Sequence, residues 1–423
     1  MRLIKKNSFV SGAGIYLLSN ILSGVIPFIL LPILTRYLSP TEYGEVAMFQ
    51  VLLGALAAFT GAVFVGSAGR KNYDSNIKTE EIAEFIGSCI QLNIFSSVIV
   101  FVTMFLFQEY LSEFLSLDPK YILLAVVVAS CSSIINIRLN QWQVKKKAIK
   151  FGILQISQSL LNMMLSLLFV VVMLEGTEGR INAQIITALV FVSISLLLLN
   201  KDKLLNIFIW RKKYIEEALK YGIPLMPHIA GGFLLVSVDR IVINKEIGLA
   251  EAGIYMVAVQ LTAAVGILFD AINKAYVPWL FEQLKADQLA QKEKIVKLTY
   301  AWFVLILLGV MLAFVIGPPL VVFIAGEQYA QAGQVVGWLA LGQGFQGMYL
   351  MVTNYILYSK RTGLLSIASI SSGILNLVLL IILVRIFGLE GAAIAFAISM
   401  GIRFLLTWWI AHKRHPMPWF NFI

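Results

Sequence analysis

Charged residues are scarce in this chain: Asp, Glu, Lys and Arg together make up 13% of its 423 residues. A soluble globular domain carries roughly 25% charged residues. Hydrophobic residues make up 59% of this chain, and its mean hydropathy is +0.85. The composition therefore excludes an ordinary soluble domain and indicates an integral membrane protein.

The chain also lacks the motifs of several functional classes. Its two cysteines, Cys89 and Cys131, both lie in apolar runs, so a disulfide framework is not expected. It contains no GxxxxGK[ST] phosphate-binding loop and no HExxH zinc motif, so neither ATP-driven pumping nor zinc hydrolysis is supported. We expect no catalytic residue, no cofactor and no metal.

Long apolar runs occupy most of the chain. A bilayer core about 30 Å thick is crossed by about 20 helical residues, and a helix satisfies its backbone hydrogen bonds internally. The runs predict an all-α integral membrane protein with about 12 transmembrane helices. Their approximate ranges are 9–35, 43–68, 82–107, 119–142, 151–174, 181–200, 215–244, 249–279, 296–316, 329–358, 362–386 and 390–411.

Lysine and arginine alternate between the two sets of loops that these helices define. One set of loops and ends carries 24 basic residues, and the opposite set carries 5: Arg36, Lys120, Arg180, Lys245 and Arg385. Because basic residues concentrate on the cytoplasmic side, the alternation predicts that both termini are cytoplasmic. The net charge of +10 is therefore mainly a topology signal, and no nucleic-acid partner is expected.

The predicted helices divide into two halves, 1–205 and 206–423. A repeat at an offset of 209 supports this division, since TRYLSPTEYGEVAM (35–48) aligns with NKEIGLAEAGIYM (244–256). EGRINAQIITALV (178–190) likewise resembles EGAAIAFAISMGI (390–402), although chance similarity of short loops is the alternative. Halves with an even number of helices share one orientation, so we expect two six-helix bundles around a central cavity.

Six ionisable side chains inside predicted helices are candidate site residues. The basic ones, outside both loop sets, are Arg138, Arg240, Lys274 and Arg403. A charge at the bilayer centre costs roughly 2.5–3.5 kcal/mol, so these groups should face protein or water. Asp239 and Asp270 are the acidic candidates for charge balance or ion coupling. Structural ion pairs, or snorkelling toward the interface, are the alternative for each basic residue.

Three segments carry a family resemblance: LLPILTRYLSPTEYGEVAMFQ (30–50), YGIPLMPHIAGGFLLVSVDRIVI (221–243) and AGIYMVAVQL (252–261). Together they resemble the polysaccharide-transporter family, the O-antigen flippases of the multidrug/oligosaccharidyl-lipid/polysaccharide exporter superfamily. The resemblance spans essentially the whole chain and implies a MATE-like fold. Arg36, Asp239 and Arg240 match the family's pattern by position.

The resemblance implies a flippase of the bacterial inner membrane. Its substrate would be an undecaprenyl-pyrophosphate-linked O-antigen or related repeat unit, moved from the cytoplasmic to the periplasmic leaflet by alternating access. The expected cationic route comprises Arg36, Arg138, Arg240, Lys274 and Arg403. Coupling to H⁺ or Na⁺, and partnership with a polysaccharide polymerase and a chain-length protein, are further expectations.

Three other functions stay open. A peptidoglycan lipid-intermediate flippase usually has two further helices. A cation-drug exporter of the same superfamily should favour carboxylates in its cavity, whereas basic candidates outnumber acidic ones here. A membrane enzyme of polysaccharide assembly would be expected to carry a large periplasmic loop or an acidic sugar-nucleotide motif, and neither is visible.

Overall fold

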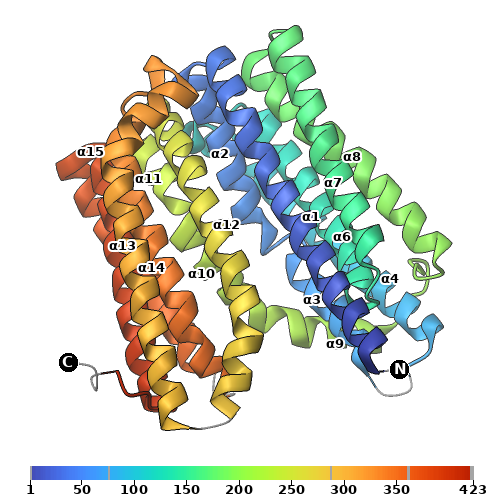
Figure 1. Ribbon diagram of the computed structural model, residues 1–423. Helices are drawn as coiled ribbons and strands as arrows, with labels where there is room; N and C mark the ends of the chain where they lie inside the picture. Colours follow the sequence, from blue (N-terminus) through green and yellow to red (C-terminus); the bar gives the residue numbers. More distant parts are fainter. Residues whose placement is uncertain (1, 75–76, 286–287, 360–362, 420–423) are drawn as a thin grey trace. The chain divides into compact units, whose positions relative to one another are not determined.

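The structure is a computed structural model that describes residues 2–74, 77–285, 288–359 and 363–419. These residues form helices and connecting turns, and no strand occurs among them. They divide into two compact units, Met1–Phe233 (unit 1) and Leu234–Ile423 (unit 2), which are described separately (Figure 1). The predicted division into halves after residue 205 stays a prediction. The boundary between the two compact units lies later, after Phe233, within α10 (Met226–Val236).

Unit 1 is built around α6, which packs against α2, α3, α4, α7 and α8. The most apolar part of α6 is 67% buried, more than in any other candidate span of the described chain. The elements of unit 1 are α1 (Arg2–Tyr37), α2 (Pro40–Ala57), α3 (Ala62–Arg70), η1 (Lys71–Tyr73), α4 (Thr79–Leu106), α5 (Gln108–Leu115), α6 (Pro119–Val144), α7 (Ala148–Ser166), η2 (Leu167–Val172), α8 (Gly176–Lys201), α9 (Lys212–Gly222), η3 (Ile223–Leu225) and the first part of α10 (Met226–Val236).

Unit 2 is built around α14, which packs against α12, α13 and α15. Its elements after α10 are α11 (Val238–Glu246), α12 (Leu249–Lys285), α13 (Leu289–Ala325), η4 (Glu327–Tyr329), α14 (Ala332–Tyr358) and α15 (Gly363–Arg414). Edge-to-face aromatic contacts hold one part of its core, where Phe303 of α13 meets Phe404 and Trp408 of α15.

The number of apolar helices agrees with a multi-pass membrane protein. Within the described ranges, ten helices are long and apolar enough to cross a bilayer, or eleven when α2 and α3–η1, bent by 47°, count as one crossing. α15 counts once among these, but Gly388 has φ 60° and ψ −135° and divides it. Because 52 helical residues would extend about 78 Å, α15 contains enough length for two crossings. The predicted pair 362–386 and 390–411 corresponds to its two parts.

One predicted helix, 215–244, ends earlier than predicted. α9, η3 and α10 form one candidate span, Lys212–Val236, and Ser237 separates it from α11. α9 packs against α3 and α4. Lys71 Nζ lies 2.7 Å from Glu217 Oε1, and Arg211 Nε lies 3.0 Å from Glu84 Oε2. These ion pairs and the buried side chain of Ile215 attach α9 to unit 1, which is why unit 1 extends past the basic linker.

One backbone hydrogen bond recurs at the predicted offset of 209, and the repeat itself stays a prediction. Ser39 caps α2, and the Glu42 side chain accepts from the Ser39 backbone N–H at 2.8 Å. The backbone bond Tyr43 N to Ser39 O (2.9 Å) has its counterpart in Ala252 N to Gly248 O (3.2 Å). The two turns differ in backbone conformation, because Ser39 is extended with φ −67° whereas Gly248 has φ 148°.

The second predicted match also recurs as structure. Gly176 is the first residue of α8 and has φ 56°, and Gly388 lies at the start of the second part of α15 with φ 60°. This left-handed conformation favours glycine at both turns. Three residues later, Gly179 and Gly391 each approach the preceding helix so closely that a Cβ atom would clash.

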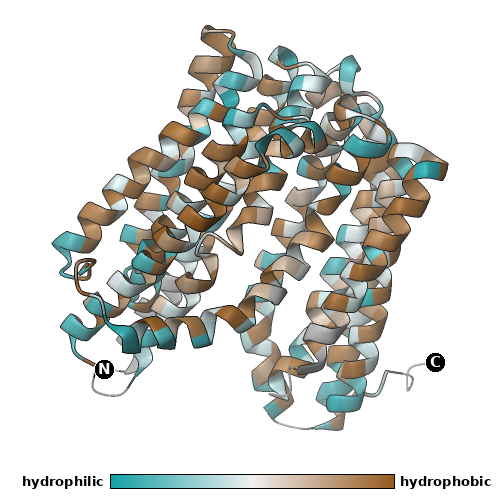
Figure 2. Cartoon of the chain, turned by 180° about the vertical axis from the view of Figure 1, so that it is seen from behind, coloured by the Kyte–Doolittle hydropathy of each residue, from teal (hydrophilic) through white to brown (hydrophobic). Residues whose placement is uncertain are grey.

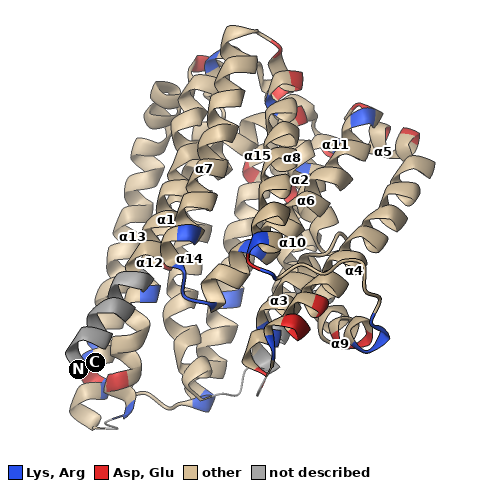
Figure 3. Ribbon diagram, turned by 90° about the vertical axis from the view of Figure 1, so that its right-hand side faces the viewer, with Lys and Arg blue, Asp and Glu red and all other residues tan. Residues whose placement is uncertain are grey.

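Polar and apolar residues are unevenly distributed along the helices of each unit. Apolar residues cover most of each helix, and hydrophilic residues gather near helix ends and connections (Figure 2). Most Lys, Arg, Asp and Glu residues lie near these ends as well (Figure 3). The charged side chains found deeper along the helices are therefore the ones to examine for function.

Candidate functional site

Asp239 and Arg240 lie at the start of α11, just after the break that separates it from α10. α10 ends at Val236, and Ser237 departs from helical geometry with φ −132° and ψ −20°. Arg240 Nη1 donates to the Val236 carbonyl oxygen at 2.9 Å. Asp239 lies in the first turn of α11, where the helix dipole favours negative charge, and its Oδ1 accepts from the Arg240 backbone N–H at 2.9 Å.

The break in the helix explains how two charges fit into an apolar segment. Asp239 and Arg240 are each only 6% exposed, and Arg240 Nη1 lies 3.7 Å from Asp239 Oδ1. The pair thus offsets its own charges and satisfies backbone groups that the break leaves open. This geometry gives Arg240 a structural role, and its contact with a substrate stays a prediction.

Three of the predicted site residues line one cavity in unit 2. Asp239 of α11, Asp270 of α12 and Arg403 of α15 border a space of about 380 Å³, which we call the unit 2 cavity. Gln343 and Gln346 of α14 contribute amide groups to the same lining. The cavity therefore combines both signs of charge with neutral polar groups.

Arg403 is held in this cavity by neutral partners. Its Nη1 donates to Gln346 Oε1 and its Nη2 to Ser369 Oγ, both at 3.2 Å, and its guanidinium lies 4.0 Å from the centre of the Tyr349 ring. Lys274 differs, because its Nζ lies 2.5 Å from Asp270 Oδ2 and both side chains are about half exposed. Lys274 therefore forms a structural ion pair, which was the alternative to a substrate contact in the sequence analysis.

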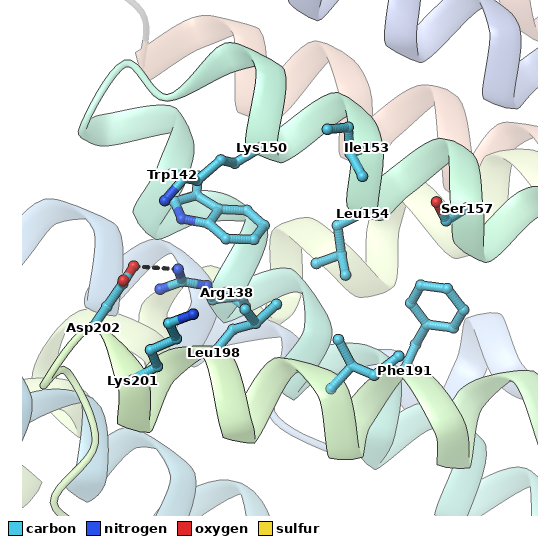
Figure 4. A pocket seen from close by; sticks show the side chains of 11 residues that line it. Arg138, Trp142, Lys150, Ile153, Leu154, Ser157, Phe191, Leu198, Lys201 and Asp202 are labelled. Carbon is cyan, nitrogen blue, oxygen red and sulfur yellow. Dashed lines mark hydrogen bonds and ion pairs between the residues drawn. The ribbon is translucent and has the colours of Figure 1, made fainter.

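The two candidates in unit 1 have different surroundings. Arg36 lies in the last turn of α1 and is exposed. Arg138 of α6 is fully buried, forms an ion pair with Asp202 just after α8, and lies 3.9 Å from the centre of the Trp142 ring (Figure 4). Burial would raise the pKa of Asp202, but its hydrogen bond and charge interaction with Arg138 outweigh this effect and lower it, so the carboxylate stays ionised.

A second polar cavity, also of about 380 Å³, lies among α1, α2, α6, α7 and α8; we call it the unit 1 cavity. Its polar lining contains one charged residue, Arg180. The other polar residues of the lining carry hydroxyl or amide groups: Ser23, Ser132, Asn136, Gln155, Gln158, Ser159, Asn162, Gln184 and Thr187. Arg180 Nη1 donates to Asn162 Oδ1 at 2.9 Å and to Ser166 Oγ at 2.8 Å.

Several polar groups of the unit 1 cavity have unused hydrogen-bonding capacity. Among the described residues, Ser23 Oγ, Gln155 Oε1 and Gln184 Nε2 are buried without a hydrogen-bond partner. Buried polar atoms are normally paired, so these atoms can serve a ligand rich in hydroxyl groups. The cavity is suited to a polar ligand with one anionic group, which Arg180 would bind.

Sequence reasoning missed Arg180, because it was assigned to a loop. The predicted helix 181–200 begins one residue after it, whereas α8 begins at Gly176. Arg180 thus lies inside the helix, in its second turn. Gly176 marks the end of the preceding apolar segment, and Glu178, an acidic residue in the first turn, was the available signal that the next helix starts earlier.

The described residues contain no group of three or more His, Cys, Asp or Glu side chains that could hold a metal ion. The two cavities present amides, hydroxyls and guanidinium groups, and the unit 2 cavity adds the carboxylates of Asp239 and Asp270.

This fold is shared with known membrane transporters. The structure of the lipid II flippase MurJ in an inward closed conformation is similar with a TM-score of 0.73 at 15% sequence identity, over 93% of this chain and 87% of that chain. An inward-facing multidrug resistance MATE family transporter of the MOP superfamily is similar with a TM-score of 0.68 at 16% identity, over 94% of both chains. The predicted all-α, MATE-like fold is confirmed, and it defines a multi-pass membrane protein of transporter architecture.

The sequence comparisons then identify the family. Residues 9–284 match the model of the polysaccharide biosynthesis protein family, and the chain belongs to this family. It is 26% identical over 382 residues to the Lsg locus putative protein 1 of Haemophilus influenzae, covering 87% of this chain and 90% of that protein. It is 23% identical over 355 residues to the succinoglycan biosynthesis transport protein ExoT of Rhizobium meliloti, covering 79% and 66% respectively.

The structural role of Arg240 gives a testable expectation. Arg240→Ala should lower the amount of protein in the membrane several-fold, together with polysaccharide export, because it leaves Asp239 buried without its partner. Arg240→Lys should restore little, since an amine does not reproduce the planar guanidinium that reaches both Val236 and Asp239. Immunoblots of membranes and surface-polysaccharide assays on the same cells provide the measurement. Normal abundance with lost export would instead indicate a substrate contact.

Proposed function

We propose that the chain is a flippase for a lipid-linked oligosaccharide in the bacterial inner membrane. Its substrate would be an undecaprenyl-pyrophosphate-linked O-antigen or related polysaccharide repeat unit, moved from the cytoplasmic to the periplasmic leaflet by alternating access. Coupling to H⁺ or Na⁺ through Asp239 or Asp270 belongs to the same proposal, as does partnership with a polymerase and a chain-length protein.

The observation that carries this proposal is the placement of two arginines among neutral partners. Arg180 and Arg403 each line a polar cavity, and each donates to amide and hydroxyl oxygens. A charged side chain within apolar helices is costly and is normally kept for a functional reason. A guanidinium held by neutral groups keeps its full charge for an anionic ligand such as a pyrophosphate.

The physics of the proposed substrate agrees with these cavities. A pyrophosphate-linked sugar cannot enter hydrocarbon, because its charges and hydroxyls would lose their hydration. Its polyprenyl tail is apolar and can stay in the lipid throughout. A protein that supports transfer therefore needs polar, cationic cavities for the head group. Membership of the polysaccharide biosynthesis family supports a polysaccharide precursor as the substrate.

Deletion of the gene tests the proposal. Surface polysaccharide should disappear, and lipid-linked repeat units should accumulate on the cytoplasmic side of the membrane. Complementation with the wild-type gene is the control. Loss of polysaccharide without accumulated intermediate would point to the alternative of an assembly enzyme, while unchanged polysaccharide with altered drug resistance would point to a drug exporter.

The proposed orientation of the chain has a separate test. Reporter fusions after residues 75, 148, 208, 288 and 361 should report a cytoplasmic location, and fusions near residues 39, 116, 177, 248, 325 and 388 a periplasmic one. Alkaline phosphatase and green fluorescent protein fusions give complementary readouts at each position. One inverted junction would refute the twelve-helix topology.

A further inference from the structure

A pocket of about 350 Å³ in unit 1 lies apart from the polar lining described above, and we call it the Trp142 pocket (Figure 4). It is formed by the C-terminal part of α6, the first half of α7 and the end of α8. Arg138, Trp142, Lys150, Lys201 and Asp202 form its polar part.

The polar part carries surplus positive charge. Asp202 balances Arg138, which leaves Lys150 and Lys201. Neither lysine has an ion-pair partner among the residues that the structure describes, and Figure 4 shows both side chains extending toward the region of Arg138 and Trp142. The pocket is therefore suited to an anion.

Its buried donors are also incompletely used. Arg138 Nε, Arg138 Nη1 and Trp142 Nε1 are buried and have no hydrogen-bond acceptor within the described ranges. Only Arg138 Nη2 is engaged, by Asp202. Buried donors normally find an acceptor, so an acceptor supplied by a ligand would complete this site.

The remaining lining is hydrocarbon: Ile153, Leu154, Phe191, Ile194 and Leu198. Ile153 is 62% exposed and the neighbouring Ile149 is 64% exposed, so the apolar lining continues onto the outer surface of α7. Ser157 is the single neutral hydroxyl in the lining, and no amide side chain occurs in it. The ligand must therefore be an anion joined to a hydrocarbon chain and not a glycan.

We propose that the Trp142 pocket binds the phosphate of an anionic glycerophospholipid, with an acyl chain lying along Ile153 and Ile194. Basic pockets between transmembrane helices bind anionic lipid head groups in this way. A bulk membrane lipid is the occupant that the chemistry favours, because it is always present and needs no sugar-binding groups. This proposal assigns Arg138, which the sequence placed in the substrate route, to a lipid site distinct from the unit 1 and unit 2 cavities. A lipid bound there would tie the ends of α6, α7 and α8 to the membrane surface.

Native mass spectrometry of the full-length purified protein tests this proposal. In the presence of dioleoyl phosphatidylglycerol, one bound lipid should persist on the wild type, whereas dioleoyl phosphatidylcholine should be lost. Lys150→Gln/Lys201→Gln should weaken phosphatidylglycerol binding about tenfold or more. The matched control is Lys285→Gln/Lys294→Gln, which removes two exposed charges from α12 and α13 and should leave binding unchanged.

Three results would overturn the proposal. Equal retention of the two lipids would show that the phosphate charge is not recognised. An equal loss in the control variant would show that general surface charge holds the lipid. Displacement of phosphatidylglycerol by equimolar undecaprenyl phosphate would assign the pocket to the polyprenyl carrier. Because all four lysines are exposed, these substitutions leave the folded core intact, and a thermal-unfolding measurement verifies this.

Discussion

Replacement of Arg180 with glutamine should reduce polysaccharide export about tenfold to a hundredfold while the protein remains at its normal level in the membrane. A hydrogen bond to a charged group contributes about 1.5–3 kcal/mol, which corresponds to this range in binding. Protein level should hold, because Arg180 donates to the neutral groups of Asn162 and Ser166 and its loss leaves no carboxylate unpaired. Surface-polysaccharide content per amount of membrane protein is the measurement.

The control for this substitution is Arg385→Gln. It removes the same charge from an exposed pair, in which Arg385 Nη2 lies 2.8 Å from Glu246 Oε1. Exposed pairs contribute little to stability, so this variant should export normally. Wild-type export by a well-expressed Arg180→Gln protein would show that the unit 1 cavity does not take part in transport.

Replacement of Asp202 with alanine should destabilise the protein by about 3–5 kcal/mol, because it leaves Arg138 as an uncompensated buried charge. The Arg138 side chain is 1% exposed and that of Asp202 is 24% exposed. The double variant Arg138→Met/Asp202→Asn should recover much of this loss, since no buried charge then remains. Thermal unfolding of the purified proteins in one detergent compares them.

The same pair predicts the direction of a pH effect. The pKa of Asp202 in the folded protein is lower than its ordinary value of 3.8, so the folded state binds this proton less readily than the unfolded state. The contribution of Asp202 to stability is therefore present above pH 3.8 and is lost as the pH falls through the lower, folded pKa. The Asp202→Ala protein should lack this component of acid sensitivity.

Glu178→Ala is a suitable control for the Asp202 experiments. Glu178 pairs with Lys120 at 3.1 Å, but both side chains are about half exposed. Solvent weakens such a pair, so its loss should leave the stability nearly unchanged. If Asp202→Ala has the same unfolding temperature as Glu178→Ala, leaving the buried Arg138 unpaired does not destabilise the protein.

Much of the fold follows from the sequence, because apolar run length and the distribution of basic residues are imposed by the bilayer. The capping turn at Ser39 and Glu42 is visible in the letters SPTE, since the serine-to-glutamate spacing of a capping box is local. The break at Ser237 was not predictable in this way. It lies among apolar residues with no adjacent proline or glycine, and the contacts of Asp239 and Arg240 stabilise it.

The candidate site was harder to predict than the fold, because its contacts join residues that are far apart in the sequence. Arg138 finds its partner at Asp202, 64 residues away in a linker, and no local pattern reports such a pairing. The polar lining of the unit 1 cavity comes from four helices, α1, α6, α7 and α8, so its amides appear in the sequence as isolated polar residues. Only packing brings them together around Arg180.

Reconstitution in vesicles tests directly whether the protein moves a lipid-linked oligosaccharide between the two leaflets. The purified protein is placed in vesicles that contain a labelled polyprenyl-pyrophosphate oligosaccharide, and a membrane-impermeant oxidant reports which sugars face outward, with and without proton or sodium gradients. We expect the protected inner-leaflet pool to become accessible with the wild type, slowly with Arg180→Gln, and not in protein-free vesicles, since the head group cannot cross hydrocarbon unaided. A protected pool that persists with the folded wild-type protein under every gradient would contradict the assignment as a flippase.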